Sequence, residues 1–200
     1  MTKTFNKAAL AATVAAVAFA ATPALAAPTS ASANGTATVK IYSPLTIAAP
    51  TATDAVVDFG ILVGTLGGAT ARTSNNFVIN ATTAPTAASV CTGAVNWSCA
   101  GSPHRALYTI TGSVNSSVNV WVSATTIDLL RAGGVITSPD DVVPLSLALS
   151  QTTDTNGDGI ADVVLAAGTA DVYVGGTLAV SSTDRDGVYT GTFTVNADYQ

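Results

Sequence analysis

The last fourteen residues, Gly187–Gln200, alternate between apolar or small side chains and polar ones. The apolar or small set, at every second position, is Tyr189, Gly191, Phe193, Val195, Ala197 and Tyr199. Such a period of two predicts a β-strand with one buried and one solvated face. Because this strand would run to the last residue, we expect no later strand to pair with its free edge. An edge of this kind has to be protected against unwanted pairing, or it has to pair with another segment.

The other end of the sequence predicts export. Lys3 and Lys7 form a basic start, residues 8–21 are an alanine-rich apolar run, and residues 24–26 resemble a cleavage site. We therefore expect a signal peptide over residues 1–26. The apolar run is shorter than the roughly 18–20 residues that a membrane helix needs. The mature protein is expected to pass through the periplasm and to end at the cell surface, or to be secreted.

The composition predicts an acidic all-β protein. Of seven basic residues, Lys3 and Lys7 lie in the expected leader, so five remain against twelve acidic ones, a net charge of −7, and every acid is aspartate. Thr, Val, Ser and Gly dominate, as in β-rich domains. Nucleic acids are excluded as partners, since their binding needs a basic surface.

Cys91 and Cys99 are the only two cysteines. In an oxidising compartment such a pair predicts a disulfide. The small loop that it closes would stabilise the fold by about 2–3 kcal/mol in the chain-entropy model. A zinc site would need more ligands, and His104 is the sole histidine.

Short strands separated by turn-forming residues predict one β-sandwich domain over residues 37–200. We expect strands at residues 36–47, 55–62, 76–81, 106–112, 118–125, 144–152, 162–166, 170–181 and 188–199. Leu129–Arg131 would suit a helical turn. Gly60 and the Gly175–Gly176 pair lie inside expected strands, where glycine indicates a bulge or a close backbone approach.

Residues 27–36 are small and polar and predict a flexible N-terminal arm. The alternation of the next residues reaches back into this arm, so that a candidate inserting strand extends to Ile41. Its apolar or small face consists of Ala31, Ala33, Gly35, Ala37, Val39 and Ile41. Such a segment is suited to pair with the open edge of another sheet. An ordinary first strand with a frayed start is the alternative.

The sequence from Asp154 to Asp162 matches the first nine positions of a calcium-binding loop. Side-chain oxygens would come from Asp154, Asn156, Asp158 and Asp162, and Ile160 would offer its carbonyl oxygen. The twelfth position is Leu165, where such loops carry a bidentate glutamate. A polar hairpin turn explains the same residues. Ca²⁺ is therefore one of two readings, and no cofactor is required.

Catalysis has little support in the sequence. His104 would need a nucleophile and an orienting acid to act as a base, and no nucleophile-elbow pattern is present. We therefore expect a protein that is not an enzyme. Trp121 is expected in or on a strand, and Trp97 either faces a partner or folds over the core.

Several segments together resemble a bacterial family of secreted domains of unknown function, akin to spore-coat protein U and to chaperone–usher pilus subunits. They are residues 38–47, 57–60, 172–178 and 187–193. The C-terminal signature of pilus subunits, with a glycine fourteenth from the end and a penultimate aromatic, is matched by Gly187 and Tyr199.

This resemblance implies an immunoglobulin-like β-sandwich that lacks its final strand. A periplasmic chaperone would fill the groove lined by Gly187 and residues 189–199. The arm of the next subunit would then replace the chaperone at an outer-membrane usher, so that copies form a pilus or fimbria-like fibre. The expected function is thus a structural subunit of a surface fibre or coat, assembled by donor-strand exchange. The alternative is a self-contained secreted binding module, calcium-stabilised and glycan-binding as an adhesin.

Overall fold

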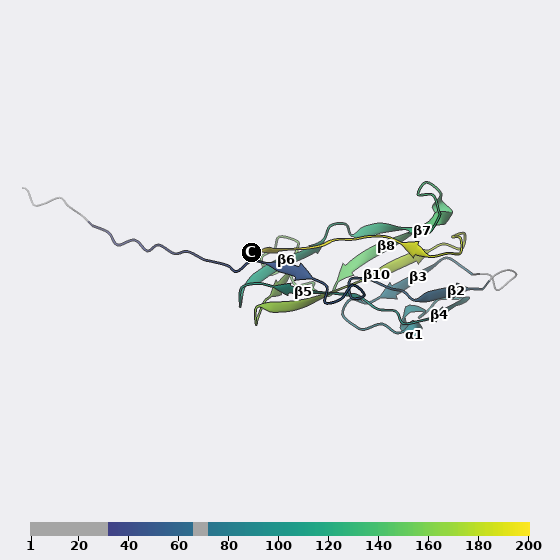
Figure 1. Ribbon diagram of the computed structural model, residues 1–200, viewed down its shortest axis with the longest axis horizontal. Helices are drawn as coiled ribbons and strands as arrows, with labels where there is room; N and C mark the ends of the chain where they lie inside the picture. Colours follow the sequence, from purple (N-terminus) through teal and green to yellow (C-terminus); the bar gives the residue numbers. More distant parts are fainter. Residues whose placement is uncertain (1–31, 66–71) are drawn as a thin grey trace, which may run out of the picture. The chain divides into compact units, whose positions relative to one another are not determined.

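The computed structural model describes residues 32–65 and 72–200. The expected signal peptide lies outside them. Residues Lys40–Gln200 form one compact unit (Figure 1). Strands account for 41% and helices for 4% of the structure, which confirms the predicted all-β sandwich class. No helix in the described residues is long and apolar enough to cross a membrane.

The larger sheet has seven antiparallel strands. Their order is β1 (Thr46–Ala48), β5 (Ala106–Thr111), β10 (Thr169–Val180), β8 (Val142–Leu149), β7 (Thr126–Arg131) and β11 (Tyr189–Thr190), with β3 (Asn75–Ile79) beside the second half of β10. The length of β10 allows it to pair with β5, β3 and β8. A short 3-10 helix, Pro139–Asp141, leads into β8.

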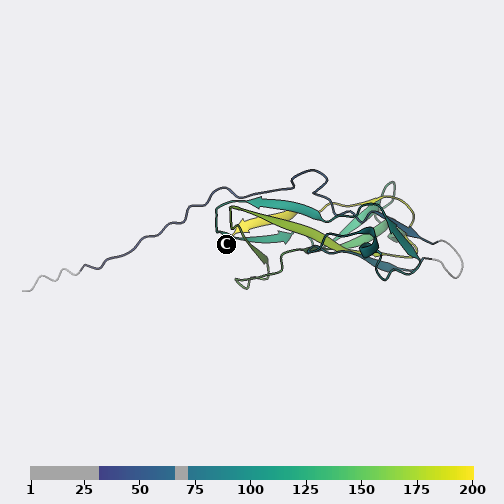
Figure 2. The ribbon, with the colours of Figure 1, turned by 90° about the horizontal axis from the view of Figure 1, so that it is seen from below.

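The second sheet has three strands in the order β12 (Val195–Tyr199), β6 (Ser117–Val122) and β9 (Ala161–Val164). Figure 2 shows β12, in yellow, at the end of the unit that carries the C-terminus. Apolar side chains of the two sheets form one buried cluster. Its members include Ile110, Val118, Val120, Val143, Leu145, Val163, Leu165, Val172, Val174 and Val195.

A two-stranded sheet of β2 (Ile61–Gly64) and β4 (Trp97–Ala100) lies with the short helix α1 (Ala87–Val90) near β3. Thr86 caps this helix, since its side chain accepts the amide of Ser89 while Ser89 Oγ accepts the amide of Thr86. The buried Val90 anchors the helix to the core.

Glycines sit where backbones approach closely. A Cβ on Gly175 would lie 2.2 Å from the carbonyl oxygen of Ile79, and one on Gly176 would lie 2.4 Å from that of Ser146. At Gly60, which has a φ of +73°, a Cβ would lie 2.5 Å from the carbonyl oxygen of Ala100. The predicted close approaches at these glycines are confirmed.

Four expectations about local structure were wrong or incomplete. Of the strand expected at residues 36–47, only Thr46 and Ile47 form strand, as part of β1, because none of the described residues pairs with the segment before them. Leu129–Arg131 is part of β7 and not a helical turn. Of the strand expected at residues 55–62, only residues 61 and 62 belong to a strand, β2. No sequence pattern indicates α1 or β4. The expected final strand is split in two, because β11 pairs with β7 in the larger sheet and β12 pairs with β6 in the smaller one.

Candidate functional site

The last strand lies at the edge of the three-stranded sheet, and among the strands that the structure describes it pairs with β6 alone. Ser123 donates its amide to the carbonyl oxygen of Thr194 at 2.9 Å, and Gln200 donates to that of Ser117 at 3.2 Å. Hydrogen-bonded pairs alternate along an antiparallel ladder. The backbone groups of the even-numbered residues of β12 therefore point toward β6.

The odd-numbered residues of β12, Val195, Ala197 and Tyr199, direct their N–H and C=O groups away from β6. Within residues 32–65 and 72–200, none of these groups has a backbone hydrogen-bond partner. This open edge is the feature that the C-terminal alternation predicts. It offers a row of donors and acceptors to an added strand.

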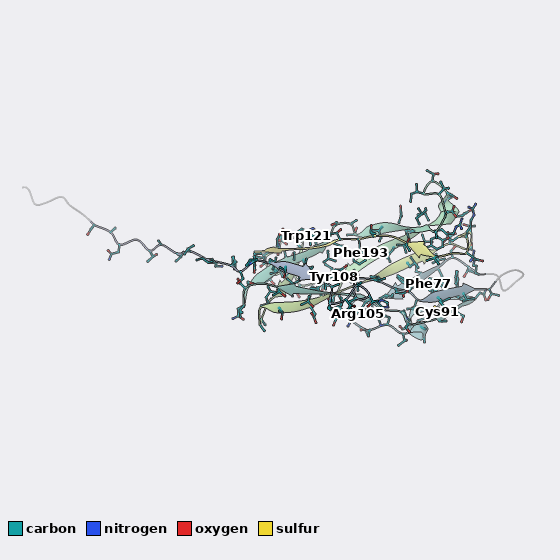
Figure 3. All side chains as sticks on the ribbon, viewed as in Figure 1. Phe77, Cys91, Arg105, Tyr108, Trp121 and Phe193 are labelled. Carbon is teal, nitrogen blue, oxygen red and sulfur yellow. A yellow bond between two sulfur atoms is a disulfide. The ribbon has the colours of Figure 1, made fainter. Side chains whose placement is uncertain are left out.

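The side chains of the same residues point toward the core. Val195 is buried, and Phe193, Ala197 and Tyr199 are half-buried against the core cluster. Phe193 meets Tyr108 edge-on, with ring centroids 6.4 Å apart (Figure 3). The predicted apolar face is therefore real, although its residues belong to two strands and a connecting segment.

A second strand edge lies nearby, because Cα atoms of β1 and β12 approach within 8 Å. Gly112 donates its amide to Gly168, so the even-numbered residues of β5 point toward β10. The backbone groups of the odd-numbered residues of β5 then point toward β1, where Thr111 and Thr109 lie opposite Thr46 and Ala48. The N–H and C=O of Ile47, between these two, therefore point away from β5. A strand added to β12 would thus lie near a second unpaired edge.

The end of β12 is held by a group that we call the tyrosine clasp, made of Tyr42, Ser43, Ser113 and Tyr199. The rings of Tyr42 and Tyr199 stack with centroids 4.4 Å apart and planes 13° apart. Tyr199 Oη donates to the carbonyl oxygen of Ser43 at 2.9 Å and accepts the Ser113 amide at 2.7 Å. Ser43 in turn donates its amide to Ser113 Oγ at 2.6 Å.

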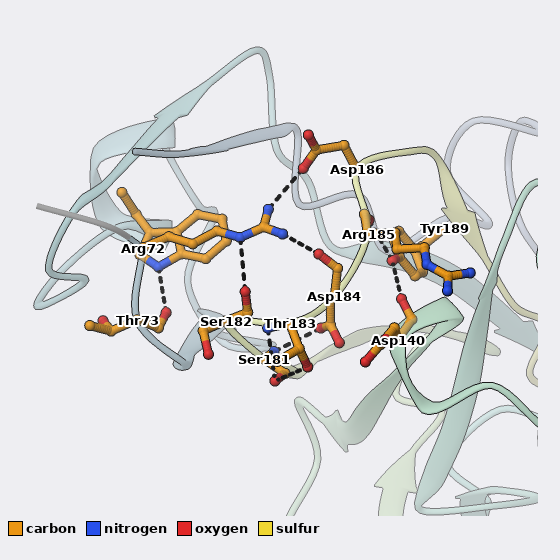
Figure 4. A network of polar contacts seen from close by, with 11 residues as sticks. Arg72, Thr73, Asp140, Ser181, Ser182, Thr183, Asp184, Arg185, Asp186 and Tyr189 are labelled. Carbon is orange, nitrogen blue, oxygen red and sulfur yellow. Dashed lines mark hydrogen bonds and ion pairs between the residues drawn. The ribbon is translucent and has the colours of Figure 1, made fainter. Parts of the chain in front are cut away.

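The start of the C-terminal segment is fixed at the opposite sheet. A Cβ on Gly187 would lie 2.8 Å from Arg131 Cγ, so the chain passes directly over the Arg131 side chain. Tyr189 Oη lies 3.1 Å from the carbonyl oxygen of Asp140 and 2.6 Å from that of Arg185. Figure 4 shows Tyr189 beside these two residues.

Asp141 is the buried acid of this region. Its carboxylate accepts a hydrogen bond from Arg131 Nε at 2.6 Å, from Arg185 Nη1 at 3.1 Å and from the Val135 amide at 3.2 Å. The hydrogen bond from Arg131 holds the pKa of Asp141 below its usual range, with further help from the Val135 amide and both arginine charges. Two arginines thereby join β7 to the turn before β11.

Arg72 holds the same turn from the other side (Figure 4). Its guanidinium donates to Asp186 Oδ1 at 2.8 Å, to the carbonyl oxygen of Ser182 at 3.3 Å and to that of Asp184. Burial raises the pKa of Asp184, whose carboxylate accepts the Ser181 amide at 2.7 Å. These contacts hold the turn before Gly187 in place and so support the residues that follow it.

The candidate calcium loop is closed by its own amides. Asp154 accepts hydrogen bonds from the amides of Gly157 at 2.7 Å, Asp158 at 3.2 Å and Gly159 at 2.8 Å. This arrangement is the side-chain-to-backbone bonding that polar turns use.

The other carboxylates of this loop are also engaged. Asp158 accepts from the Ile160 amide at 2.8 Å and from Asn156 Nδ2 at 3.0 Å, and Asp162 accepts from the Thr155 amide at 2.5 Å. Among the residues that the structure describes, no three His, Cys, Asp or Glu side chains are grouped so as to hold a metal. Calcium binding by this loop stays a prediction.

Cys91 and Cys99 form the predicted disulfide, with Cα atoms 5.7 Å apart. It joins the residue after α1 to β4, in the part of the unit that Figure 3 marks with Cys91 and Phe77. Trp97 of β4 packs edge-on against Phe77 at 5.1 Å and donates to the carbonyl oxygen of Thr73. Of the two readings for Trp97, folding over the core is the one observed.

His104 contacts main-chain oxygens. Its ring nitrogens lie 3.3 Å from the carbonyl oxygen of Ser102 and 3.2 Å from that of Thr53, and Asp58 Oδ2 lies 4.0 Å away. These contacts include no hydroxyl or thiol that could act as a nucleophile. Trp121 lies in β6 and is half-buried.

The candidate inserting strand has no regular structure where it is described. Residues 32–43 are exposed and adopt neither helix nor strand, and the exposed fractions of Val39 and Ile41 are 82% and 87%. Ala31 lies outside the described residues. The larger apolar side chains of the arm are therefore available to another surface.

Sequence reasoning did not find Tyr42, Ser113 or Asp141. Tyr42 and Tyr199 are far apart in the chain, and no local pattern signals that their rings stack. No sequence motif links Asp141 to Arg131 and Arg185. The available signals are an aspartate in a turn and an arginine that follows two leucines, and neither signal identifies its partner.

No curated protein and no solved structure matches the chain. Residues 64–199 match the family model described as a domain of unknown function, DUF4402. The match begins within β2 and covers every later strand, while β1 and the arm lie before it. Because this match covers more than half of the sequence, the chain belongs to the DUF4402 family.

Proposed function

We propose that the chain is a structural subunit of a surface fibre or coat in which each copy inserts its N-terminal arm beside β12 of the next. From here on, the arm means residues 27–41, which include the candidate inserting strand. The observation that carries this proposal is the open edge of β12. Its outward backbone groups belong to Val195, Ala197 and Tyr199, whose side chains face the core. An added strand would gain main-chain hydrogen bonds there and cover half-buried apolar side chains.

The arm supports the proposal through its exposure and its length. Residues 32–41 would span about 33 Å when extended, and the five residues of β12 about 17 Å, at roughly 3.3 Å per residue. The arm is therefore long enough to cover the whole edge. Val39 and Ile41 supply the large apolar side chains that would be buried.

The geometry of this exchange would produce a fibre. The arm and the edge are different surfaces of one chain, and a contact between different surfaces that does not close on itself gives an open filament. An edge of this kind invites mispairing before assembly. The proposed partners are thus copies of the chain, a periplasmic chaperone that covers the edge, and an outer-membrane usher, with export to the cell surface.

Deleting residues 27–41 tests the arm. The truncated chain should bind a chaperone through its open edge and should not supply a strand to another copy. Sheared surface material should give a detergent-resistant ladder on an unboiled gel for the full chain, and one band after boiling. If the truncated chain still forms the ladder and filaments, the arm is not the inserted strand.

Ala197→Pro tests the edge itself. The Ala197 N–H points away from β6, so proline removes an outward donor and leaves the ladder to β6 intact. We expect a folded chain that donates its arm and accepts none, so that it terminates fibres. Asn196→Pro is the control, because it removes an N–H that points toward β6 and should unfold the sheet edge. Normal fibre growth by the Ala197→Pro chain would exclude the β12 edge as the acceptor.

The self-contained binding module makes opposite predictions for the same experiments. It should run as a monomer in both lanes, without a chaperone and without filaments. If calcium stabilises it, its melting temperature should fall when a chelator is added.

A further inference from the structure

The segment Lys40–Leu45 crosses the end of the three-stranded sheet. Lys40 and Tyr42 line one hollow with residues 114–117 and Gln200. Gln200 donates its amide to Ser117 at the start of β6. The hollow thus lies beyond the end of β12 toward β6, whereas the open edge lies on the other side of β12.

The tyrosine clasp fixes this crossing. The Tyr42 ring stacks on Tyr199, and Ser43 is bonded through its amide to Ser113 and through its carbonyl oxygen to Tyr199. A Cβ on Gly112 would lie 2.3 Å from Tyr199 Oη, so the hydroxyl occupies the space that this glycine leaves. Leu45 then packs against the core and leads directly into β1.

An arm that closed on its own domain would need a different path. To lie along the open edge of β12 in the same copy, the chain would have to turn back over residues 42–45. That turn would break the stack of Tyr42 on Tyr199 and both hydrogen bonds of Ser43.

We infer that the tyrosine clasp keeps the arm from pairing with the β12 edge of its own copy and so reserves that edge for a second copy. The inference rests on the proposed function, because it takes the arm as the strand that fills the edge. A block of this kind is needed, since a short flexible tether gives an intramolecular partner an effective concentration of about millimolar. Without the clasp, closure within one copy would outcompete exchange between copies.

Cross-linking of the full chain tests the inference. Thr38→Cys places a thiol in the arm, and Thr194→Cys places one at the exposed start of the β12 edge, at the end away from the clasp. A short bis-maleimide then joins the two thiols where the arm lies along the edge. A denaturing gel separates a link within one copy from links between copies. The pair of thiols is introduced into the otherwise unchanged chain, into Tyr42→Ala and into the control Tyr42→Phe, which keeps the stacked ring.

The expected result is a ladder of linked copies for the unchanged and Tyr42→Phe chains. In Tyr42→Ala the share of links within one copy should rise by up to about tenfold, which is the factor that one aromatic stack supplies. Links within one copy in the unchanged chain, or the same ladder in Tyr42→Ala, would overturn the inference and leave the edge as the acceptor. If no chain forms links of either kind, the arm does not meet the edge, and the proposed function fails together with the inference.

Discussion

Arg131 donates from Nε to Oδ1 of Asp141 over 2.6 Å, and the Asp141 side chain is only 2% exposed. This contact joins the end of β7 to the start of β8, and Arg185 brings the turn before β11 to the same carboxylate. The acid therefore supports the beginning of the C-terminal segment whose far end carries the open edge.

Replacing Asp141 with asparagine should destabilise the fold strongly, because two arginines would lose their shared negative partner in a buried position. Urea unfolding should show a much larger loss of stability than for Asp140→Asn, the adjacent turn residue. Equal effects of the two substitutions would show that the ion pairs contribute nothing specific.

The same pair predicts an acid-sensitive fold. Because the pKa of Asp141 is lower in the folded protein than the ordinary value of about 3.9, the unfolded chain takes up a proton at higher pH than the folded one. The stability from this carboxylate is thus fully present above about pH 4 and is lost as the pH falls through the lower, folded value. Unfolding measured from pH 6 to pH 2 should show a steeper acid loss for the unchanged chain than for Asp141→Asn.

Gly175→Ala should destabilise the larger sheet by about 1–3 kcal/mol or more. The new Cβ would lie 2.2 Å from the Ile79 carbonyl oxygen and 2.7 Å from the Ala81 amide, and backbone atoms cannot swing aside. Gly35→Ala is the control, since a Cβ there meets nothing within 4 Å. Similar melting temperatures for both variants would contradict the close approach of β3 to β10.

Asp154→Ala should loosen the loop before β9 and cost about 1 kcal/mol, because three amides lose their shared acceptor. Thermal unfolding measures this cost. Thermal unfolding of the unchanged chain, measured with calcium and again with a chelator, tests whether the loop binds calcium. A lower melting temperature in the chelator would show that the loop binds calcium. An unchanged melting temperature would show that the loop is a polar turn without calcium.

Part of this fold could be predicted from the sequence because alternation is a local signal. The strands around Val118–Val122 and Val172–Val180 alternate over enough residues to be recognised, and both formed close to the expected bounds. β4 has only four residues, Trp97–Ala100, which is too short for a pattern. In β7 the alternation is hard to recognise, because two adjacent leucines are followed by Arg131. This charged residue is half-buried in the folded chain, where it pairs with Asp141.

The open edge was predictable and the contacts at its two ends were not. Alternation from Tyr189 to Tyr199 indicates which side chains face inward, but it does not reveal that the chain changes sheets between β11 and β12. Tyr199 and Ser43 are 156 residues apart, so that only the folded chain brings them together.

Amide hydrogen exchange along β12 tests the central claim most directly. The amides of Asn196 and Asp198 point toward β6 and should be protected both in the single subunit and in assembled material. The amides of Ala197 and Tyr199 point outward and should exchange quickly in the single subunit and become protected on assembly. If these two amides are protected already in the subunit, or stay unprotected in the assembly, no strand is added to the β12 edge and the account is wrong.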